Sequence, residues 1–482
     1  MPDLSCNTAG IKSPNPFWLA SGPPTNTGYQ VRNAFDVGWG GAVWKTLTDD
    51  PIVNVASRYG GIALNNQKLM GLNNIELISD RPLDDNLREM AEIKKAYPRH
   101  AVIASVMMES KKESWHRVIK RIQDVGVDGF ELNFGCPHGM SERGMGSAVG
   151  QVPEYAEMIC SWVKEVSTIP VLAKLTPNVT NVKEIGRACK RGGADGISLI
   201  NTINSIMGVD IDNFAPKPSV GGFGSHGGYC GPAVKPIALN MVADIATDPQ
   251  INLPISGIGG IRKWDDVVEF ILLGAISVQV CTAVMHRGFG VVKAMTKGLL
   301  KWMEEKGFES IEDFRGKSTP RIRTWGELDL NYKVIADVNE QTCIHCGICY
   351  ACCEDGCYQA INWDKLPAAQ YKERFGFDPR KMRGEAAPNL NLDAGGAAID
   401  VFTINRDACV GCNMCALACP VEGCITMKEI PTGKPAMNWN QYQTMLKEGR
   451  IEKIEPKKAV KAFDGNGRVP SVSGSATQPQ AR

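Results

Sequence analysis

The first 300 residues alternate between two kinds of hydrophobic pattern, and this alternation limits the possible folds more than any other feature of the sequence. Short runs of apolar and β-branched residues are separated by longer segments with amphipathic helical spacing, such as 113–126 and 152–166. Near-continuous apolar runs are typical of parallel strands that are buried on both faces. The expected strands are 17–21, 41–46, 102–107, 129–134, 171–176, 196–201, 254–260 and 277–283.

Eight buried parallel strands that alternate with helices over about 300 residues predict a (β/α)8 TIM barrel. A doubly wound open sheet is the alternative, because it also alternates strands and helices. Such a sheet usually carries G-x-G-x-x-G between its first strand and helix. The only literal match, 222–227, follows no expected strand, and we interpret it as a loop. We therefore expect a barrel without a dinucleotide site.

The chain has 482 residues, more than one hydrophobic core usually organises, so we expect two or three structural units. Charged residues make up 22% and the formal net charge is +1, which indicates no nucleic-acid partner. The N-terminus lacks a signal-peptide pattern, and no apolar run reaches about 18 residues. We expect a cytoplasmic protein that neither spans nor binds membranes, and in which the 17 cysteines do not form disulfides.

Eleven of the 17 cysteines lie between residues 343 and 424, and eight of them repeat the spacing C-x2-C-x2-C-x3-C. This spacing is typical of paired [4Fe-4S] clusters, in which three close thiolates hold one cluster and the fourth cysteine crosses to the other. The first expected ligand set is Cys343, Cys346, Cys349 and Cys419. The second expected ligand set is Cys353, Cys409, Cys412 and Cys415.

Alternatives to this interpretation remain open. A zinc site or unmetallated thiols would also use cysteines, but zinc sites usually combine two ligand pairs rather than triplets at two-residue gaps. Cys352 lies beside Cys353, and the first motif lacks the proline that follows Cys419, so the identity of the first crossing ligand is ambiguous. Cys357 and Cys424 are expected to lie near the clusters without serving as ligands.

These patterns divide the chain into segments. Residues 1–300 are expected to form the barrel, and 301–335 a charged, partly helical connector. Residues 336–430 are expected to form a ferredoxin-like domain with an inserted loop at about 362–402, because the motifs lie further apart than a minimal ferredoxin needs. Residues 431–482 are expected to form a C-terminal extension whose polar end is disordered.

Polar residues stand at the carboxyl ends of the expected strands, where barrels of this kind place their active sites. Lys45 and Lys174 lie in otherwise apolar runs, and an ammonium group near a core usually has a partner. Either lysine alone could simply be solvated. Together at one face they favour a flavin, because a nearby cation stabilises the negative charge of the reduced form. Gly259 and Gly260 suit a phosphate group that is bound by backbone N–H groups.

Several segments carry a family resemblance. They are "LNNIELIS" (72–79), "ELNFGCPHGMSERGMG" (131–146), "AKLTPNVT" (173–180), "INTINSIMG" (200–208) and "SGIGGIR" (256–262). With the cysteine motifs, they closely resemble the dihydropyrimidine dehydrogenase family, and in particular its bacterial flavin and iron-sulfur subunit, the PreA type. The resemblance covers essentially residues 1–430. It implies a dihydroorotate dehydrogenase-like (β/α)8 TIM barrel that binds FMN, followed by a ferredoxin-like domain with two [4Fe-4S] clusters.

The resemblance implies reduction of the C5=C6 bond of uracil and thymine, with a hydride from reduced FMN and a proton from Cys136. A thiol suits this role because its ordinary pKa near 8.5 leaves it mostly protonated at neutral pH. Glycines at 139, 144 and 146 would let the loop after Cys136 close over the substrate. The implied pyrimidine-binding residues are Asn74, Asn133, Asn201 and Thr202. The implied FMN contacts are Ala20, Ser21, Gly22, Lys45, Thr46, Lys174, Gly228, Gly231, Gly259, Gly260, Cys281 and Thr282.

The resemblance also implies partners. The animal-type enzyme carries NADPH and FAD sites on the same polypeptide, and this chain departs from that pattern. We therefore expect a separate flavoprotein subunit, of the PreT type, to oxidise NAD(P)H and pass electrons to the clusters. A homodimer of this chain, within an assembly of two copies of each subunit, follows from the same analogy.

Two other functions compete with this interpretation. A dihydroorotate dehydrogenase uses a similar FMN barrel with a loop cysteine or serine, but its own chain usually lacks a fused two-cluster ferredoxin. A non-catalytic electron carrier would use the barrel only as a scaffold, and the loop cysteine and strand-end lysines argue against it. A flavin spectrum of the purified protein separates an enzyme from such a scaffold.

Overall fold

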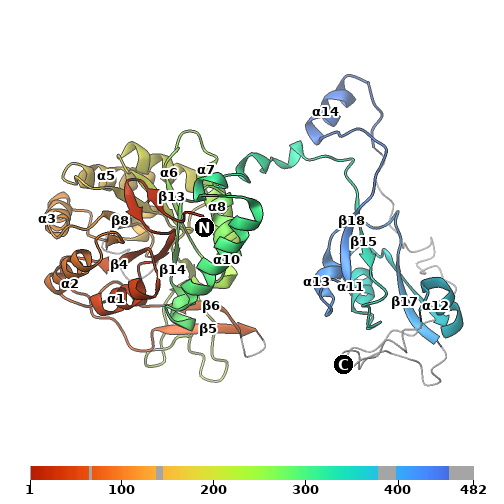
Figure 1. The fold of residues 1–482 in the computed structure, drawn as a ribbon, viewed down its shortest axis with the longest axis horizontal. Coiled ribbons are helices and arrows are strands. Elements are labelled where there is room, and N and C mark those ends of the chain that lie inside the picture. Colours follow the sequence, from red (N-terminus) through yellow and green to blue (C-terminus); the bar gives the residue numbers. More distant parts are fainter. Residues whose placement is uncertain (1, 65–67, 137–144, 378–397, 455–482) are drawn as a thin grey trace. The chain divides into compact units, whose positions relative to one another are not determined.

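The fold was analysed in a computed structural model that describes residues 2–64, 68–136, 145–377 and 398–454. The chain divides into two compact units, Met1–Ile322 and Arg323–Arg482 (Figure 1). Each unit has a hydrophobic core of its own. Within the described residues, none of the helices combines the length and hydropathy that crossing a bilayer requires.

The first unit is a closed parallel barrel, which confirms the predicted fold and excludes the open sheet. Its strands follow the order β10-β13-β14-β3-β4-β7-β8-β9, and each contains residues from one of the eight predicted runs. In chain order they are β3 (Phe17–Leu19), β4 (Gly41–Leu47), β7 (Ala101–Val106), β8 (Gly129–Asn133), β9 (Val171–Lys174), β10 (Gly196–Leu199), β13 (Ile255–Ile258) and β14 (Ser277–Val280). Every residue in these strands is buried, as expected for a sheet covered on both faces.

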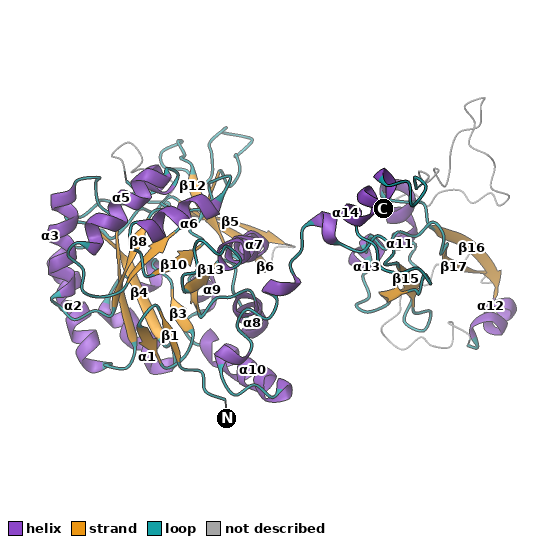
Figure 2. Cartoon of the chain, turned by 90° about the horizontal axis from the view of Figure 1, so that it is seen from above, coloured by secondary structure: helices purple, strands orange, loops and turns teal. Residues whose placement is uncertain are grey.

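Helices surround the barrel and bury one apolar stripe each against the strands (Figure 2). In α3, for example, Trp115, Val118, Ile119 and Ile122 are buried at the helical spacing that places them on one face. The outer helices are α1 (Gly28–Val37), α2 (Leu83–Ala96), α3 (Lys112–Gln123), α5 (Pro153–Lys164), α6 (Val182–Arg191), α7 (Lys235–Ala246), α8 (Trp264–Leu272) and α10 (Val291–Lys306). Short helices α4 (Ser147–Gly150) and α9 (Thr282–Arg287) follow β8 and β14.

The two ends of the barrel are covered differently. A hairpin of β1 (Cys6–Thr8) and β2 (Ile11–Ser13) closes the amino-terminal end, where Ile11 packs among Trp18, Val43 and Ile103. At the carboxyl ends of the strands lies an antiparallel sheet with the order β11-β12-β6-β5, which the sequence did not predict. Its strands are β5 (Tyr59–Leu64), β6 (Lys68–Asn74), β11 (Ile203–Ser205) and β12 (Gly227–Cys230).

The barrel unit extends beyond residue 300, where the sequence placed a connector. Helix α10 ends at Lys306, and the chain then packs back on the barrel through Ile311 and Phe314, both buried. Phe314 contacts the rings of Trp302 and Phe308, so these aromatic residues hold the segment in place. The boundary between the units falls after Ile322.

In the described residues of the second unit, two strand pairs and the short helices α11 (Ile348–Gly356) and α13 (Met414–Ala418) form a ferredoxin-like arrangement, as predicted. Strand β15 (Val334–Val338) precedes the first cysteine motif and pairs with β18 (Ile425–Glu429), which follows the second motif. Strand β16 (Ile361–Pro367) pairs in the same antiparallel way with β17 (Ala398–Ile404). Helices α11 and α13 each carry cysteines of one motif.

The predicted inserted loop at about 362–402 requires a correction. It begins within β16 and ends within β17, and helix α12 (Ala368–Phe375) follows β16 directly. Alternating residues in β16 and an apolar run in β17 explain the pairing, and Tyr371, Ile399 and Val401 form a small buried core. Residues 378–397 lie outside the described part of the chain, as does the polar end at 455–482. Helix α14 (Trp439–Lys447) belongs to the C-terminal extension.

Candidate functional site

A cavity of about 460 Å³ lies at the carboxyl ends of the barrel strands, and we call it the barrel cavity. It is lined by every predicted barrel residue except Gly228. Gly228 lies immediately behind the lining, where a Cβ atom would come within 2.2 Å of Thr202 Oγ1. Residues 137–144, which include His138 and two of the predicted loop glycines, lie outside the described residues. The structure thus gathers the predicted residues at one end of the barrel.

One wall of the barrel cavity is a chain of hydrogen-bonded amides and hydroxyls. Asn201 Nδ2 donates to Asn133 Oδ1 at 2.9 Å, and Asn133 Nδ2 donates to Thr46 Oγ1 at 3.0 Å. The backbone N–H of Thr202 donates to Asn201 Oδ1 at 2.8 Å. Because each amide is oriented by its neighbour, this wall presents donors and acceptors in fixed positions.

Cys136 lines the cavity at the end of β8 and is only 7% exposed. It packs against Ile78, Met107 and Met145, which are apolar. Its backbone carbonyl accepts a hydrogen bond of 3.1 Å from the N–H of Ser147, at the start of α4. The thiol is therefore held beside the polar wall in a mainly apolar environment.

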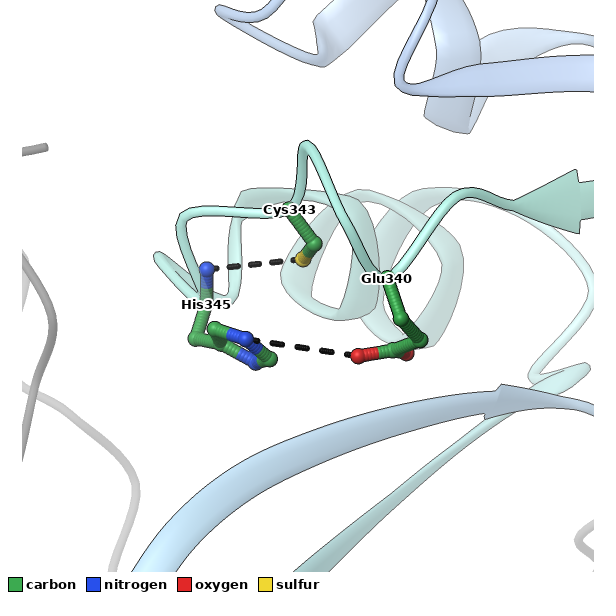
Figure 3. Close-up of side chains that lie close together, drawn as sticks. All are labelled: Glu340, Cys343 and His345. Carbon is green, nitrogen blue, oxygen red and sulfur yellow. Dashed lines mark hydrogen bonds and ion pairs between the residues drawn. The ribbon is translucent and has the colours of Figure 1, made fainter. Parts of the chain in front are cut away.

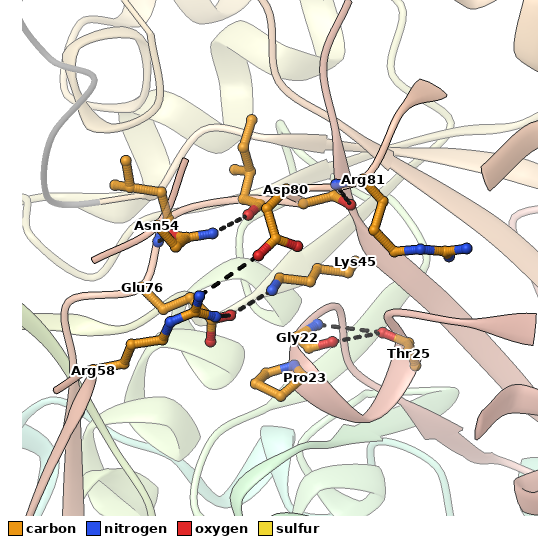
Figure 4. Close-up of polar contacts among 12 residues, drawn as sticks. Gly22, Pro23, Thr25, Lys45, Asn54, Arg58, Glu76, Asp80 and Arg81 are labelled. Atoms are coloured by element: carbon orange, nitrogen blue, oxygen red, sulfur yellow. Dashed lines mark hydrogen bonds and ion pairs between the residues drawn. The ribbon is translucent and has the colours of Figure 1, made fainter. Parts of the chain in front are cut away.

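Both predicted lysines are buried and paired with carboxylates. Lys45 Nζ lies 2.5 Å from Glu76 Oε1, and the two side chains are 5% and 6% exposed. Arg58 approaches the same oxygen at 2.9 Å, as Figure 4 shows, and Tyr59 also donates to Glu76. The Glu76 carboxylate therefore accepts from two cations and one hydroxyl group at the barrel cavity, and these contacts fix its position.

Lys174 is paired inside the barrel. Its Nζ lies 3.2 Å from Glu131 Oε1, and Glu131 is fully buried. Ser198 Oγ and Gln279 Nε2 each donate to Glu131 Oε2 at 2.8 Å. The carboxylate is thus satisfied by a cation and two neutral donors, as a buried charge must be.

Glu76 and Glu131 were not singled out from the sequence. Glu131 is the one charged residue in the apolar run 129–134, which was an available signal, because an isolated charge in a buried strand needs a partner. Glu76 lies in a segment without strand or helix periodicity. Glu76 follows β6 in the chain, and only the tertiary fold places it beside Lys45 on β4.

Three glycines form a narrow part of the barrel cavity. Gly231, Gly259 and Gly260 have φ angles of 98°, 129° and 75°, which favour glycine. A Cβ atom on Gly260 would lie 2.7 Å from Lys235 Cβ, so a side chain does not fit there. Arg262, Lys263 and Arg287 line the same cavity and supply positive charge. Exposed backbone and positive charge together suit an anionic group such as a phosphate.

Two further cysteines line the barrel cavity. Burial raises the pKa of the Cys230 thiol to about 11 and that of the Cys281 thiol to about 12. We therefore expect their alkylation by iodoacetamide to keep rising about tenfold per pH unit up to pH 9.5, because only the thiolate reacts. An ordinary thiol levels off above about pH 8.5. Peptide mass spectrometry of the flavin-free chain measures both rates, and a plateau near pH 8.5 would contradict the expected burial.

The second unit contains two cavities lined by cysteines. The first cysteine cavity is lined by Cys343, Cys346, Cys349, Cys419 and Cys424. The second cysteine cavity is lined by Cys353, Cys357, Cys409, Cys412 and Cys415. Each expected ligand set, including its crossing cysteine, thus lines one cavity. Cys353 lines the second cavity and Cys352 does not, which favours Cys353 as the crossing residue.

Glu340, Cys343 and His345 also lie close enough to surround a cation (Figure 3). His345 is buried, with Nδ1 2.7 Å from the carbonyl oxygen of Asp400 and Nε2 4.0 Å from Glu340. Tyr371 in α12 donates to Glu340 at 2.8 Å. Because Cys343 lines the first cysteine cavity, we interpret this group as the contact that fixes the first motif against β17 and α12.

The sequence comparisons agree with this geometry. A family model described as dihydroorotate dehydrogenase matches residues 3–303, and a 4Fe-4S binding domain matches 402–423. The NAD-dependent dihydropyrimidine dehydrogenase subunit PreA of Escherichia coli K12 is 41% identical over 364 residues, which cover 75% of this chain and 88% of that protein. The chain belongs to the dihydropyrimidine dehydrogenase family.

Two further relatives show how far the similarity extends along the chain. The chloroplastic dihydropyrimidine dehydrogenase (NADP(+)) of Arabidopsis thaliana is 44% identical over 338 residues, 68% of this chain and 79% of that protein. The catalytic subunit of dihydroorotate dehydrogenase B (NAD(+)) from Pyrococcus abyssi is 37% identical over 317 residues, 65% of this chain and 98% of that protein. The 364-residue match is longer than the barrel unit, Met1–Ile322, so the dihydropyrimidine dehydrogenase similarity reaches into the second unit.

Proposed function

We propose that this chain reduces the C5=C6 bond of uracil and thymine to 5,6-dihydropyrimidines, with FMN in the barrel cavity and two [4Fe-4S] clusters in the second unit. One observation carries the proposal. The barrel cavity holds Cys136 beside the Asn133 and Asn201 amides and the two buried lysines, in a chain that is 41% identical to a dihydropyrimidine dehydrogenase subunit.

The barrel cavity has the features that an FMN site requires. Gly231, Gly259 and Gly260 leave room that a Cβ atom would fill, and three basic side chains line the same cavity, so the phosphate would bind there. Lys45 and Lys174 would face the ring system. When bound, the flavin supplies a hydride to the substrate, and a nearby cation stabilises its reduced form. The remaining predicted contacts that line the cavity are Ala20, Ser21, Gly22, Thr46, Cys281 and Thr282, and Gly228 lies behind them.

The chain's own residues supply the proton and the orientation of the substrate. Asn74, Asn133, Asn201 and Thr202 would hold the alternating carbonyl and N–H groups of the pyrimidine, because an amide offers one donor edge and one acceptor. Cys136 Sγ would then donate its proton to C5 of the ring. Cys136 packs with Ile78, Met107 and Met145 and is only 7% exposed, so few water molecules would compete for its proton.

Electrons would reach the barrel through the clusters. Cys343, Cys346, Cys349 and Cys419 would hold the first, and Cys353, Cys409, Cys412 and Cys415 the second, because each set lines one cavity. A separate flavoprotein subunit of the PreT type would oxidise NAD(P)H and reduce the clusters. A homodimer of this chain within a heterotetramer, in the cytoplasm, completes the proposal.

Replacing Gly260 with alanine should reduce the FMN content of the purified chain by about tenfold or more. The new Cβ atom would lie 2.7 Å from Lys235 Cβ, and the φ of 75° is unfavourable for alanine, so the proposed phosphate site would distort. Gly290→Ala is the matched control, because nothing lies within 4 Å of its Cβ position and its φ is −60°. Flavin fluorescence after heat release measures the content. Equal content in both variants would exclude this phosphate site.

A ligand titration tests the proposed substrate class. Uracil, thymine and orotate are added separately to the oxidised, anaerobically purified chain, and the flavin absorbance is followed. The proposal predicts saturable spectral changes with uracil and thymine and none with orotate. A response to orotate alone would favour the dihydroorotate reaction, as in the relative that is 37% identical. Absence of flavin from the purified chain would favour an electron carrier.

A further inference from the structure

Each cysteine cavity contains one thiol more than a [4Fe-4S] cluster binds. A cluster takes four cysteine ligands, whereas each cavity is lined by five cysteines. The additional thiols are Cys424 in the first cavity and Cys357 in the second. Neither Cys424 nor Cys357 belongs to the repeated C-x2-C-x2-C-x3-C spacing, so the motifs do not assign either thiol as a ligand. A role for either thiol at a cluster rests on the proposed function, in which both clusters are present.

Cys424 lies among the expected ligands of the first cluster, in the lining of the same cavity. It stands directly before β18, is 2% exposed, and its Sγ lies 3.8 Å from the carbonyl oxygen of Asn339. It lines the same cavity as Cys343 and Cys419, two of the expected ligands of the first cluster. Those two cysteines come from different motifs, so Cys424 lies where the ligands of the first cluster converge.

Cys357 has a different environment. It is partly exposed, and it shares its cavity with Cys412, which is itself exposed. Cys424 instead shares its cavity with Val338, Phe402 and Ile425, which are apolar. Water can compete for an open iron position in the second cavity, whereas the first cavity offers a buried thiol in its place. Cys424 is therefore the thiol with the stronger case for a role at its cluster.

We propose that Cys424 is a reserve ligand of the first cluster, which replaces Cys419 or Cys343 when either bond to iron is lost. In the exchange, the iron bond to the Cys419 sulfur breaks and an iron bond to the Cys424 sulfur forms. The proton of the Cys424 thiol passes to the departing Cys419 thiolate, which lines the same cavity. Charge and electron count are unchanged, so no oxidant or reductant is needed. The exchange keeps the electron path intact when one ligand is damaged.

Iron and sulfide analysis of four full-length proteins tests this inference. After anaerobic purification the wild-type chain should contain about eight iron atoms, four for each cluster. Cys424→Ala should retain about eight, because the reserve thiol is not used. Cys419→Ala should also retain about eight, because Cys424 takes over. The double variant Cys419→Ala/Cys424→Ala should retain about four, those of the second cluster. The EPR spectrum of the reduced proteins should change between wild type and Cys419→Ala, since one ligand differs.

The outcomes separate the inference from the proposed function. A wild-type chain with about four iron atoms or fewer would contradict the two-cluster proposal itself. A wild-type chain with about eight, combined with equal iron in the single and double Cys419 variants, would overturn the reserve role of Cys424. If Cys419→Ala does not accumulate, the same comparison is made with Cys343→Ala and Cys343→Ala/Cys424→Ala, because Cys343 lines the same cavity as Cys424. Retained FMN shows in each case that the barrel unit is folded, and about four retained iron atoms show that the second unit still binds its other cluster.

Discussion

Replacing Cys136 with alanine is expected to lower kcat for uracil reduction by about 10²- to 10⁴-fold, the usual contribution of a general acid. The flavin content should not change, because Cys136 lies at the end of β8 beside the amide wall rather than at the glycines proposed to bind phosphate. Cys136→Ser should recover little activity, since a hydroxyl is a much weaker acid than a thiol. Steady-state kinetics with dithionite as the electron donor measures the loss.

A thiol outside the barrel cavity provides the control for the Cys136 variants. Cys6 lies in β1 at the opposite end of the barrel, where it contacts Ser13 at 3.2 Å. Cys6→Ala should therefore leave kcat unchanged within about twofold, as expected for a site without contact to the reaction. Full activity in Cys136→Ala, with the product still formed, would assign the proton to another group.

Replacing Lys174 with methionine is expected to destabilise the barrel unit by about 3–5 kcal/mol. The substitution leaves Glu131 fully buried without its cation, and such an uncompensated charge is costly. The double variant Glu131→Gln/Lys174→Met should recover most of this loss, because the neutral amide can still bond Ser198. Urea unfolding of the flavin-free chain, followed by the fluorescence of the buried barrel tryptophans, measures both.

The same variants separate the structural role of Lys174 from its proposed flavin contact. The double variant should regain stability but not FMN content, because the cation proposed to face the flavin is still missing. Lys111→Met is the matched control, since Lys111 pairs with Glu109 on the surface and should change neither property. Recovery of both stability and FMN content in the double variant would show that Lys174 acts on the fold alone.

The barrel was predictable from the sequence because each strand is buried on both faces and reads as a continuous apolar run. The gathering of strand-end residues followed from the barrel itself, as with Asn133 and Lys174 on neighbouring strands. The division of the motif cysteines between two cavities was equally predictable, since the repeated spacing of the motifs indicates which thiols can lie together.

Other features depend on contacts between distant segments and were not predictable. The pairing of Lys45 with Glu76 requires the antiparallel sheet to form over the barrel, and its strands show no clear alternation of polar and apolar residues. The expected loop at about 362–402 proved to begin and end in paired strands, because β16 pairs with β17, which lies beyond the residues between them in the chain. Gly228 lies so close to Thr202 that a Cβ atom would not fit between them, and only the packing of the folded chain reveals this requirement.

The most direct test of the proposed function is reoxidation of the reduced chain by pyrimidine. The protein is purified anaerobically and reduced with a small excess of dithionite, and uracil or thymine is then added while the flavin absorbance is recorded. The proposal predicts that the flavin is reoxidised and that mass spectrometry finds the pyrimidine heavier by two hydrogen atoms. A flavin that stays reduced with both pyrimidines, in a chain that contains FMN and both clusters, would contradict it.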